Sequence, residues 1–177
     1  MLFRSGDHWL VTGISPQPDP HPLGIAIDIG TTTVAILVTD LRDGKVLGGA
    51  ANFNKQMHLG DDVLTRINLC STDPTMTKHL QELIVKDTLA PLITEALAKA
   101  GAAPGNIRCM TIAANTTMLH LFAGVDPSSI GVAPFTPTFL EHRIISSADL
   151  PFPEPISRSP FTIHLLPGRS EEHTSEL

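Results

Sequence analysis

The chain has 177 residues, of which 42% are hydrophobic and 17% charged, and its formal net charge is −6. This length and composition fit one globular domain of ordinary size, or a part of a larger one. Net acidity without a basic run argues against a nucleic-acid partner. No apolar run reaches the ~18 residues that a membrane-spanning helix needs, so no membrane partner is expected.

Both ends of the chain look foreign to the rest. Residues 169–177 (RSEEHTSEL) reverse-translate into a common sequencing adapter, and residues 2–5 (LFRS) into the end of its partner adapter. We expect residues 1–5 and 169–177 to be artefacts on a metagenomic fragment; a short arm and a polar tail are the alternative. Residues 6–23 are a lead-in with a proline-rich linker, because each proline fixes φ and disfavours helix before it. The domain proper is expected over residues 24–168.

The first structural signal is the stretch 24–41. An apolar run that contains Asp28 is followed by Gly30, three threonines and a second apolar run. An Asp-Gly turn at 43–44 separates the second run from a third, which begins at Val46. This pattern predicts three antiparallel strands joined by tight turns. It also predicts that Asp28 is a buried carboxylate inside the first strand.

The turn after the first strand has the composition of a phosphate site. Gly30 allows a ligand to approach the backbone closely, and successive N–H groups in such a turn can form an anion-binding concavity. Thr31, Thr32 and Thr33 add neutral donors. Asp28 is placed to hold Mg²⁺ through water, because Mg²⁺ prefers oxygen ligands and retains several waters. The alternative is an ordinary hairpin; an unpaired carboxylate in an apolar strand is costly and favours the phosphate site.

A polar segment leads into the first expected helix. The amides of Asn52, Asn54 and Gln56 alternate with other side chains and indicate a polar cleft. Asp61 or Asp62 can cap the helix, because a carboxylate at a helix N-terminus interacts favourably with the helix dipole. Asp62 is also a candidate Mg²⁺ ligand. Arg66 lies one turn on. It either pairs with Asp62 at i,i+4 or contacts a ligand.

Residues 76–100 form the strongest helical pattern of the chain. Apolar residues recur at spacings of three and four, which is typical of an amphipathic helix on one face of a sheet. Pro91 lies inside the pattern and removes the N–H bond to Asp87. We therefore expect either a kink or two helices, with Pro91 in the first turn of the second. Gly101 ends the helix.

The next strand is expected at 107–114, where a nearly continuous apolar run is typical of a central strand covered on both faces. The chain then turns into a helix that ends at Gly124, with Asn115 or Thr116 as the N-cap. Ligands of doubly wound α/β sheets lie outside the carboxyl ends of the strands. Asn115 is therefore expected to face the same cleft as Asp28.

Several other residues receive structural interpretations. His120 is interpreted as a core or capping histidine, and Phe135 as an anchor onto the core or onto a partner. Cys70 and Cys109 cannot by themselves hold zinc or an iron–sulfur cluster. Two buried free thiols in a reducing cytoplasm are the expectation. Residues 161–167 are expected to form a final strand.

Four segments together resemble a known family. Asp28–Thr33 (DIGTTT) between two strands resembles the first phosphate loop of the ATPase superfamily of actin, the sugar kinases and Hsp70. Gly60–Ile67 (GDDVLTRI), Asn115–Leu121 (NTTMLHL) and Ala133–Pro137 (APFTP) are similar to segments of the reductive activators of corrinoid-dependent enzymes. Those activators are ATP-using iron–sulfur proteins that return a corrinoid from cobalt(II) to cobalt(I). The resemblance covers residues 22–168.

This resemblance implies an actin-like (ribonuclease H-like) α/β lobe, with a mixed sheet that starts with three antiparallel strands and has helices packed on it. It further implies that the lobe binds ATP and Mg²⁺, and that Ala114 replaces a glycine usual in the family. The roles implied for individual residues are catalysis for Asp28 and Asn115, nucleotide binding for Gly30, Thr31, Thr32, Thr33 and Thr116, and metal binding for Asp28 and Asp62.

The resemblance also implies partners outside this chain. A ferredoxin-type domain with an iron–sulfur cluster is expected upstream, a corrinoid protein is the expected partner, and the second ATPase lobe is expected to be missing here. Two alternatives come from other classes of protein. A small-metabolite kinase of the same superfamily would need a catalytic acid, for which Asp61 and Asp62 are the only candidates. A non-catalytic binding module predicts that Asp28→Ala changes neither partner binding nor nucleotide response.

Overall fold

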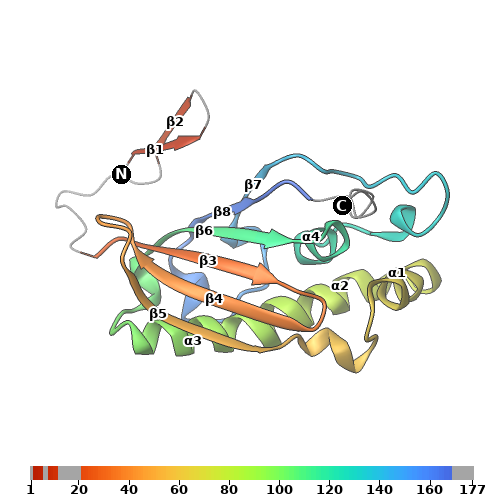
Figure 1. The fold of residues 1–177 in the computed structure, drawn as a ribbon, viewed down its shortest axis with the longest axis horizontal. Coiled ribbons are helices and arrows are strands. Elements are labelled where there is room, and N and C mark those ends of the chain that lie inside the picture. Colours follow the sequence, from red (N-terminus) through yellow and green to blue (C-terminus); the bar gives the residue numbers. More distant parts are fainter. Residues whose placement is uncertain (1, 6–7, 12–20, 169–177) are drawn as a thin grey trace, which may run out of the picture.

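A computed structural model describes residues 2–5, 8–11 and 21–168 (Figure 1). Its main feature is a six-stranded mixed sheet with the strand order β5-β4-β3-β6-β8-β7. The strands of this sheet are β3 (Leu23–Ile29), β4 (Thr33–Asp40), β5 (Val46–Phe53), β6 (Ile107–Ala114), β7 (Arg143–Ser146) and β8 (Thr162–Leu165). Strands β1 (Leu2–Ser5) and β2 (His8–Val11) pair in a separate antiparallel sheet. The expected adapter at 169–177 and most of the proline-rich linker lie outside the described residues.

The three antiparallel strands predicted at the start of the domain are confirmed. β3 pairs with β4, and β4 with β5, both antiparallel. The Asp-Gly turn closes with a hydrogen bond from the Gly44 N–H to the Asp40 carbonyl oxygen at 2.9 Å. Gly44 has a φ of 76°, which explains why glycine stands there. β6 then joins β3 in parallel, and β8 joins β6 in parallel, so β6 is central as predicted.

The helices lie mainly on one face of this sheet. In Figure 1, α2 and α3 run together beneath β3, β4 and β5. The helices are α1 (Val63–Thr72), α2 (Thr75–Glu82), the π-helix η2 (Leu83–Leu89), α3 (Ala90–Lys99) and α4 (Thr116–Ala123). Short 3₁₀ turns are η1 (Lys55–His58), η3 (Pro104–Asn106), η4 (Ser128–Ile130), η5 (Ser147–Asp149) and η6 (Ile156–Arg158).

The interruption predicted at Pro91 takes the form of a π-helical segment. Pro91 lies in the first turn of α3, and η2 directly precedes that helix. Within η2 the bonds reach back five residues, as from the Ala90 N–H to the Val85 carbonyl. The Thr88 hydroxyl also donates to the Leu83 carbonyl at 2.8 Å. The wider turn accommodates a proline that has no N–H and whose ring crowds the preceding turn.

The core lies between the helices and one face of the sheet. Ile25, Ile27 and Ile29 of β3 are buried there, whereas Ala26 and Asp28, which point to the other face, are exposed. The prediction that Asp28 is buried was therefore wrong. The physical reason is that successive side chains of a strand point to opposite faces, and the helices α2 and α3 cover only one of them.

The remaining expectations for the fold are largely confirmed. The final strand forms as β8, and Cys70 and Cys109 are buried and free. Burial raises the pKa of both thiols. Within residues 2–5, 8–11 and 21–168, no helix has the length and apolar character needed to cross a bilayer.

Candidate functional site

The turn between β3 and β4 is held in place through its carbonyl oxygens. The Asn54 side-chain amide donates to the Gly30 oxygen at 3.0 Å, and the Asn54 N–H donates to the Thr32 oxygen at 2.7 Å. Arg66 donates to the Thr31 oxygen at 2.6 Å. The Gly30 N–H donates to the Thr33 oxygen at 2.9 Å. All four carbonyls of the turn are thus occupied by donors of the chain itself.

This arrangement determines which way the N–H groups of the turn point. In a trans peptide the C=O and the following N–H point in opposite directions, and both cis peptides of the described residues lie elsewhere. The N–H groups of Thr31, Thr32 and Thr33 therefore point away from the donors that hold the turn. Thr31 is half-buried, and Thr32 and Thr33 are exposed. Such N–H groups, in a turn of exposed and half-buried threonines, are the kind of donor that an anion-binding turn uses.

Asn115 reaches this turn from a distant part of the chain. Its side-chain oxygen accepts the Met118 N–H at 2.9 Å and so caps α4, while its side-chain nitrogen donates to the Thr31 hydroxyl at 3.3 Å. The parallel pairing of β3 with β6, in which Asp28 lies opposite Ala113, brings the carboxyl ends of the two strands together. Asn115 and the 30–33 turn therefore share one edge of the sheet, as predicted.

Arg66 makes contacts that the sequence did not predict. Its guanidinium is fully buried and donates to the carbonyls of Gly60 and Thr31 and to the side chains of Gln56 and Met118. Of the two alternatives expected for Arg66, the i,i+4 ion pair with Asp62 does not form. A buried donor takes the nearest fixed acceptors, and these come from segments that only the tertiary fold brings together.

Asp62 has the structural role that was the alternative to metal binding. Its carboxylate accepts the Thr65 N–H at 2.7 Å and the Thr65 hydroxyl at 3.1 Å, and it caps α1. These hydrogen bonds lower the pKa of Asp62. Among the described residues, no group of three or more His, Cys, Asp or Glu side chains is arranged to hold a metal ion.

Asn54 and Gln56 support the site from behind the turn. Both are buried. Gln56 accepts from Arg66 at 2.9 Å and donates to the Leu80 carbonyl at 2.8 Å. The alternation of amides in this segment was the only local signal for them, and it identified neither the turn nor Arg66 as a partner.

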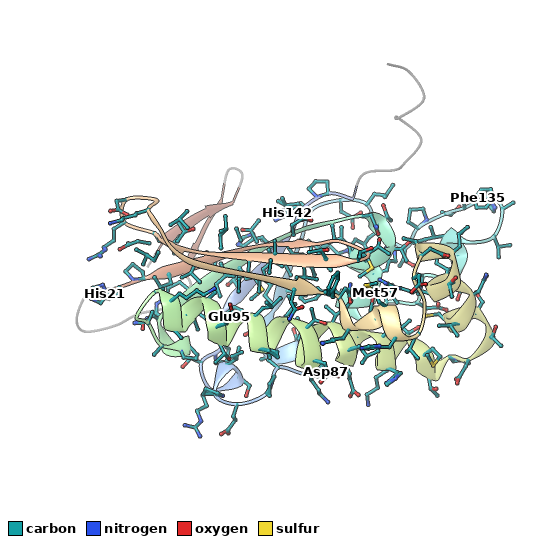
Figure 2. All side chains as sticks on the ribbon, turned by 60° about the horizontal axis from the view of Figure 1, so that its bottom comes forward. His21, Met57, Asp87, Glu95, Phe135 and His142 are labelled. Atoms are coloured by element: carbon teal, nitrogen blue, oxygen red, sulfur yellow. The ribbon has the colours of Figure 1, made fainter. Side chains whose placement is uncertain are left out.

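His120 has the core role that the sequence favoured. Its Nδ1–H donates to the Thr116 carbonyl at 2.7 Å, and its Nε2 accepts the Thr138 N–H at 3.0 Å. The ring stacks on Phe139, with centroids 4.3 Å apart. This arrangement requires neutral histidine, and burial lowers its pKa. Phe139 is thus the core anchor of this loop, and not Phe135, which is 60% exposed on the outer part of the loop (Figure 2).

Comparison with known proteins places the chain in a family. The family model described as the RACo middle region matches residues 23–170. The chain belongs to this family. The corrinoid activation enzyme RamQ of Eubacterium limosum is 35% identical over 130 residues, which are 73% of this chain and 22% of that protein.

A solved structure gives the same result for the fold. The reductive activator for corrinoid, iron–sulfur protein is 34% identical to this chain, with a TM-score of 0.79. The match covers 86% of this chain and 24% of the activator chain. The α/β lobe predicted from the sequence is therefore confirmed. This chain spans about a quarter of the length of either relative. Its two cysteines do not fit an iron–sulfur cluster.

Proposed function

We propose that this chain is the part of an ATP-dependent reductive activator of a corrinoid protein that carries the first phosphate-binding loop. The observation that carries the proposal is the 30–33 turn, whose four carbonyls are held by the chain. In this proposal the N–H groups and hydroxyls of Thr31, Thr32 and Thr33 bind phosphate oxygens. Gly30 lets the turn close tightly enough to present them.

The neighbouring polar residues have distinct roles in the proposal. Asp28 is exposed beside the turn, where its carboxylate holds Mg²⁺ through water, as a magnesium–phosphate complex favours. Asn115 fixes the Thr31 hydroxyl and positions phosphate or water, and Thr116 lies next to it at the start of α4. Asp62, which caps α1, lies at most in the outer region of the metal site.

The link to corrinoid reduction rests on the two relatives. Reduction of cobalt(II) is uphill, and bound nucleotide supplies free energy that is linked to the binding of the partner. If one state of the corrinoid protein binds more tightly to the nucleotide-bound activator, that state becomes more populated. The electron comes from an iron–sulfur cluster in another domain of the activator. The corrinoid protein is the partner, and a second lobe closes over the nucleotide.

The phosphate site can be tested in the 177-residue chain by titration with inorganic tripolyphosphate, followed through backbone amide shifts. We expect the largest shifts at residues 30–33, with tighter binding when Mg²⁺ is present. Asp28→Asn should remove only the gain in tripolyphosphate affinity that Mg²⁺ gives. Asp43→Asn, at the exposed turn at the other end of the hairpin, is the matched control. Shifts spread evenly over the chain, or an unchanged Mg²⁺ dependence in Asp28→Asn, would contradict the proposal.

A further inference from the structure

Among the described residues, the buried guanidinium of Arg66 donates to neutral acceptors only. Its four hydrogen bonds go to two backbone carbonyls, one side-chain amide oxygen and the sulfur of Met118, at 2.6 to 3.2 Å. None of the ion pairs among the described residues includes Arg66. The positive charge is thus hydrogen-bonded but has no carboxylate in contact.

A buried charge of this kind is costly unless a counter-charge is supplied. Arginine does not escape this cost by losing its proton, because its guanidinium stays charged in proteins. Asp61 and Asp62 act on Arg66 only at longer range, and the Asp62 carboxylate is bound to Thr65. The site therefore carries, next to the 30–33 turn, a positive charge that has no carboxylate of the described residues in contact with it.

The charge is also aligned with one N–H group of the turn. Arg66 donates to the carbonyl of Thr31, and the N–H of Thr32 belongs to the same peptide unit and points the opposite way. A charged donor at the carbonyl polarises the peptide and strengthens its N–H as a donor. The central N–H of the turn is thus the one that is reinforced by a full positive charge.

We propose that Arg66 is a positioning residue for phosphate, whose bound negative charge is the counter-charge that Arg66 lacks. Arg66 does not touch the ligand; it acts through the peptide between Thr31 and Thr32. The inference rests on the proposed phosphate site and adds an electrostatic residue to it. The competing explanation is a purely structural clamp, in which only the hydrogen bonds of Arg66 matter.

Substitution of Arg66 separates charge from hydrogen bonding. Arg66→Lys keeps the charge but cannot reproduce the planar set of bonds, whereas Arg66→Met loses both. In the 177-residue chain, titrated with inorganic tripolyphosphate at constant ionic strength, we expect Arg66→Met to weaken binding on the order of tenfold to a hundredfold. Arg66→Lys should recover most of that loss. Equal losses in both variants would support the clamp and overturn the inference.

A second pair of variants leaves Arg66 in place, in case its removal prevents folding. Gln56→Glu puts a carboxylate where the amide oxygen now lies, 2.9 Å from Arg66, and so supplies an internal counter-charge. Gln56→Met loses the same amide bonds without adding charge. We expect Gln56→Glu to bind tripolyphosphate about tenfold more weakly than Gln56→Met.

The outcomes separate this inference from the proposed function. Equal affinity in the two Gln56 variants, or wild-type affinity in Arg66→Met, overturns the role of Arg66 while the phosphate site stands. If the wild-type chain shows no shifts at residues 30–33, the phosphate site itself fails, and this inference fails with it.

Discussion

The turn between β3 and β4 closes around Gly30, where an added Cβ would lie 2.6 Å from the carbonyl oxygen of Thr33. This oxygen belongs to the backbone and cannot move aside as the end of a flexible side chain could. Glycine is therefore required at position 30 because there is no room for a Cβ, and not because of a positive φ. The same turn depends on Asn54, a buried side chain that binds two of its carbonyls through its own N–H and amide. The missing Cβ of Gly30 and the two hydrogen bonds of Asn54 thus determine the conformation of the turn.

Gly30→Ala is predicted to destabilise the fold by about 1–3 kcal/mol, as overpacking does, and to abolish the tripolyphosphate-induced shifts at residues 30–33. Chemical denaturation and the amide titration measure the two effects. Gly105→Ala is the control, because its Cβ would meet only the Ser159 hydroxyl oxygen at 3.9 Å. It should change stability by less than about 0.5 kcal/mol. Normal stability in Gly30→Ala would contradict the proposed closure.

His120 predicts a pH dependence of stability. Burial, the largest cause, and the charge of Arg143 lower its pKa below the ordinary 6.5. As the pH falls, the unfolded chain therefore takes up the proton first. The stabilisation that neutral His120 contributes is complete above about pH 6.5, the pKa of the unfolded chain. It is lost as the pH falls through the lower pKa of the folded state.

Thermal unfolding between pH 7 and pH 5 tests this prediction. The melting temperature should fall on acidification, and the fall should be smaller in His120→Gln. Part of the dependence should remain, because burial and His142 lower the pKa of His164 as well. An identical pH profile in wild type and His120→Gln would show that His120 does not contribute.

At the scale of elements, the π-helical segment η2 connects the helical layer to the site. The Thr88 hydroxyl donates to the Leu83 carbonyl within η2 and accepts the Lys55 N–H at 3.1 Å. Lys55 directly follows Asn54, which holds the turn. The π-helix thus accommodates Pro91 and also fixes the segment that anchors the 30–33 turn.

Thr88→Val keeps the shape of the side chain but leaves the Lys55 N–H without its acceptor. We expect a loss of about 1–3 kcal/mol in the free energy of unfolding, measured by urea denaturation. Thr94→Val is the matched control, since Thr94 bonds only the Ala90 carbonyl from an exposed position of α3. It should cost less than about 0.5 kcal/mol. Similar losses in both variants would mean that the link from η2 to residue 55 is unimportant.

At the scale of the whole molecule, the matched part of this chain spans about a quarter of the length of its relatives. Its candidate site lies at one edge of the sheet, where the 30–33 turn and Asn115 are accessible or half-buried. Phosphoryl chemistry depends on groups that surround the phosphates and exclude water. The described residues contribute the 30–33 turn and the Asn115 amide to such an environment.

The purified chain is therefore predicted not to turn over ATP and to bind nucleotide weakly at best. Phosphate release under multiple-turnover conditions should equal that of Gly30→Ala. Clear ATP hydrolysis by the wild-type chain alone, absent in Gly30→Ala, would contradict this prediction.

The sequence was sufficient where local patterns decide structure. Apolar runs, an Asp-Gly turn and a helical repeat predicted the antiparallel strands, the interrupted helix and the central strand β6. The motif order predicted the family. These signals are readable because strand alternation, turn chemistry and helical spacing are properties of neighbouring residues.

Only the tertiary structure decided the surroundings of the charged groups. The sequence placed Asp28 in a strand but not on its exposed face, because exposure depends on which face the helices cover. It placed Arg66 on a helix but not against the Thr31 carbonyl, 35 positions away. Burial and long-range hydrogen bonds are set by segments distant in the sequence, so the turn was predictable from local residues, whereas the buried cation behind it was not.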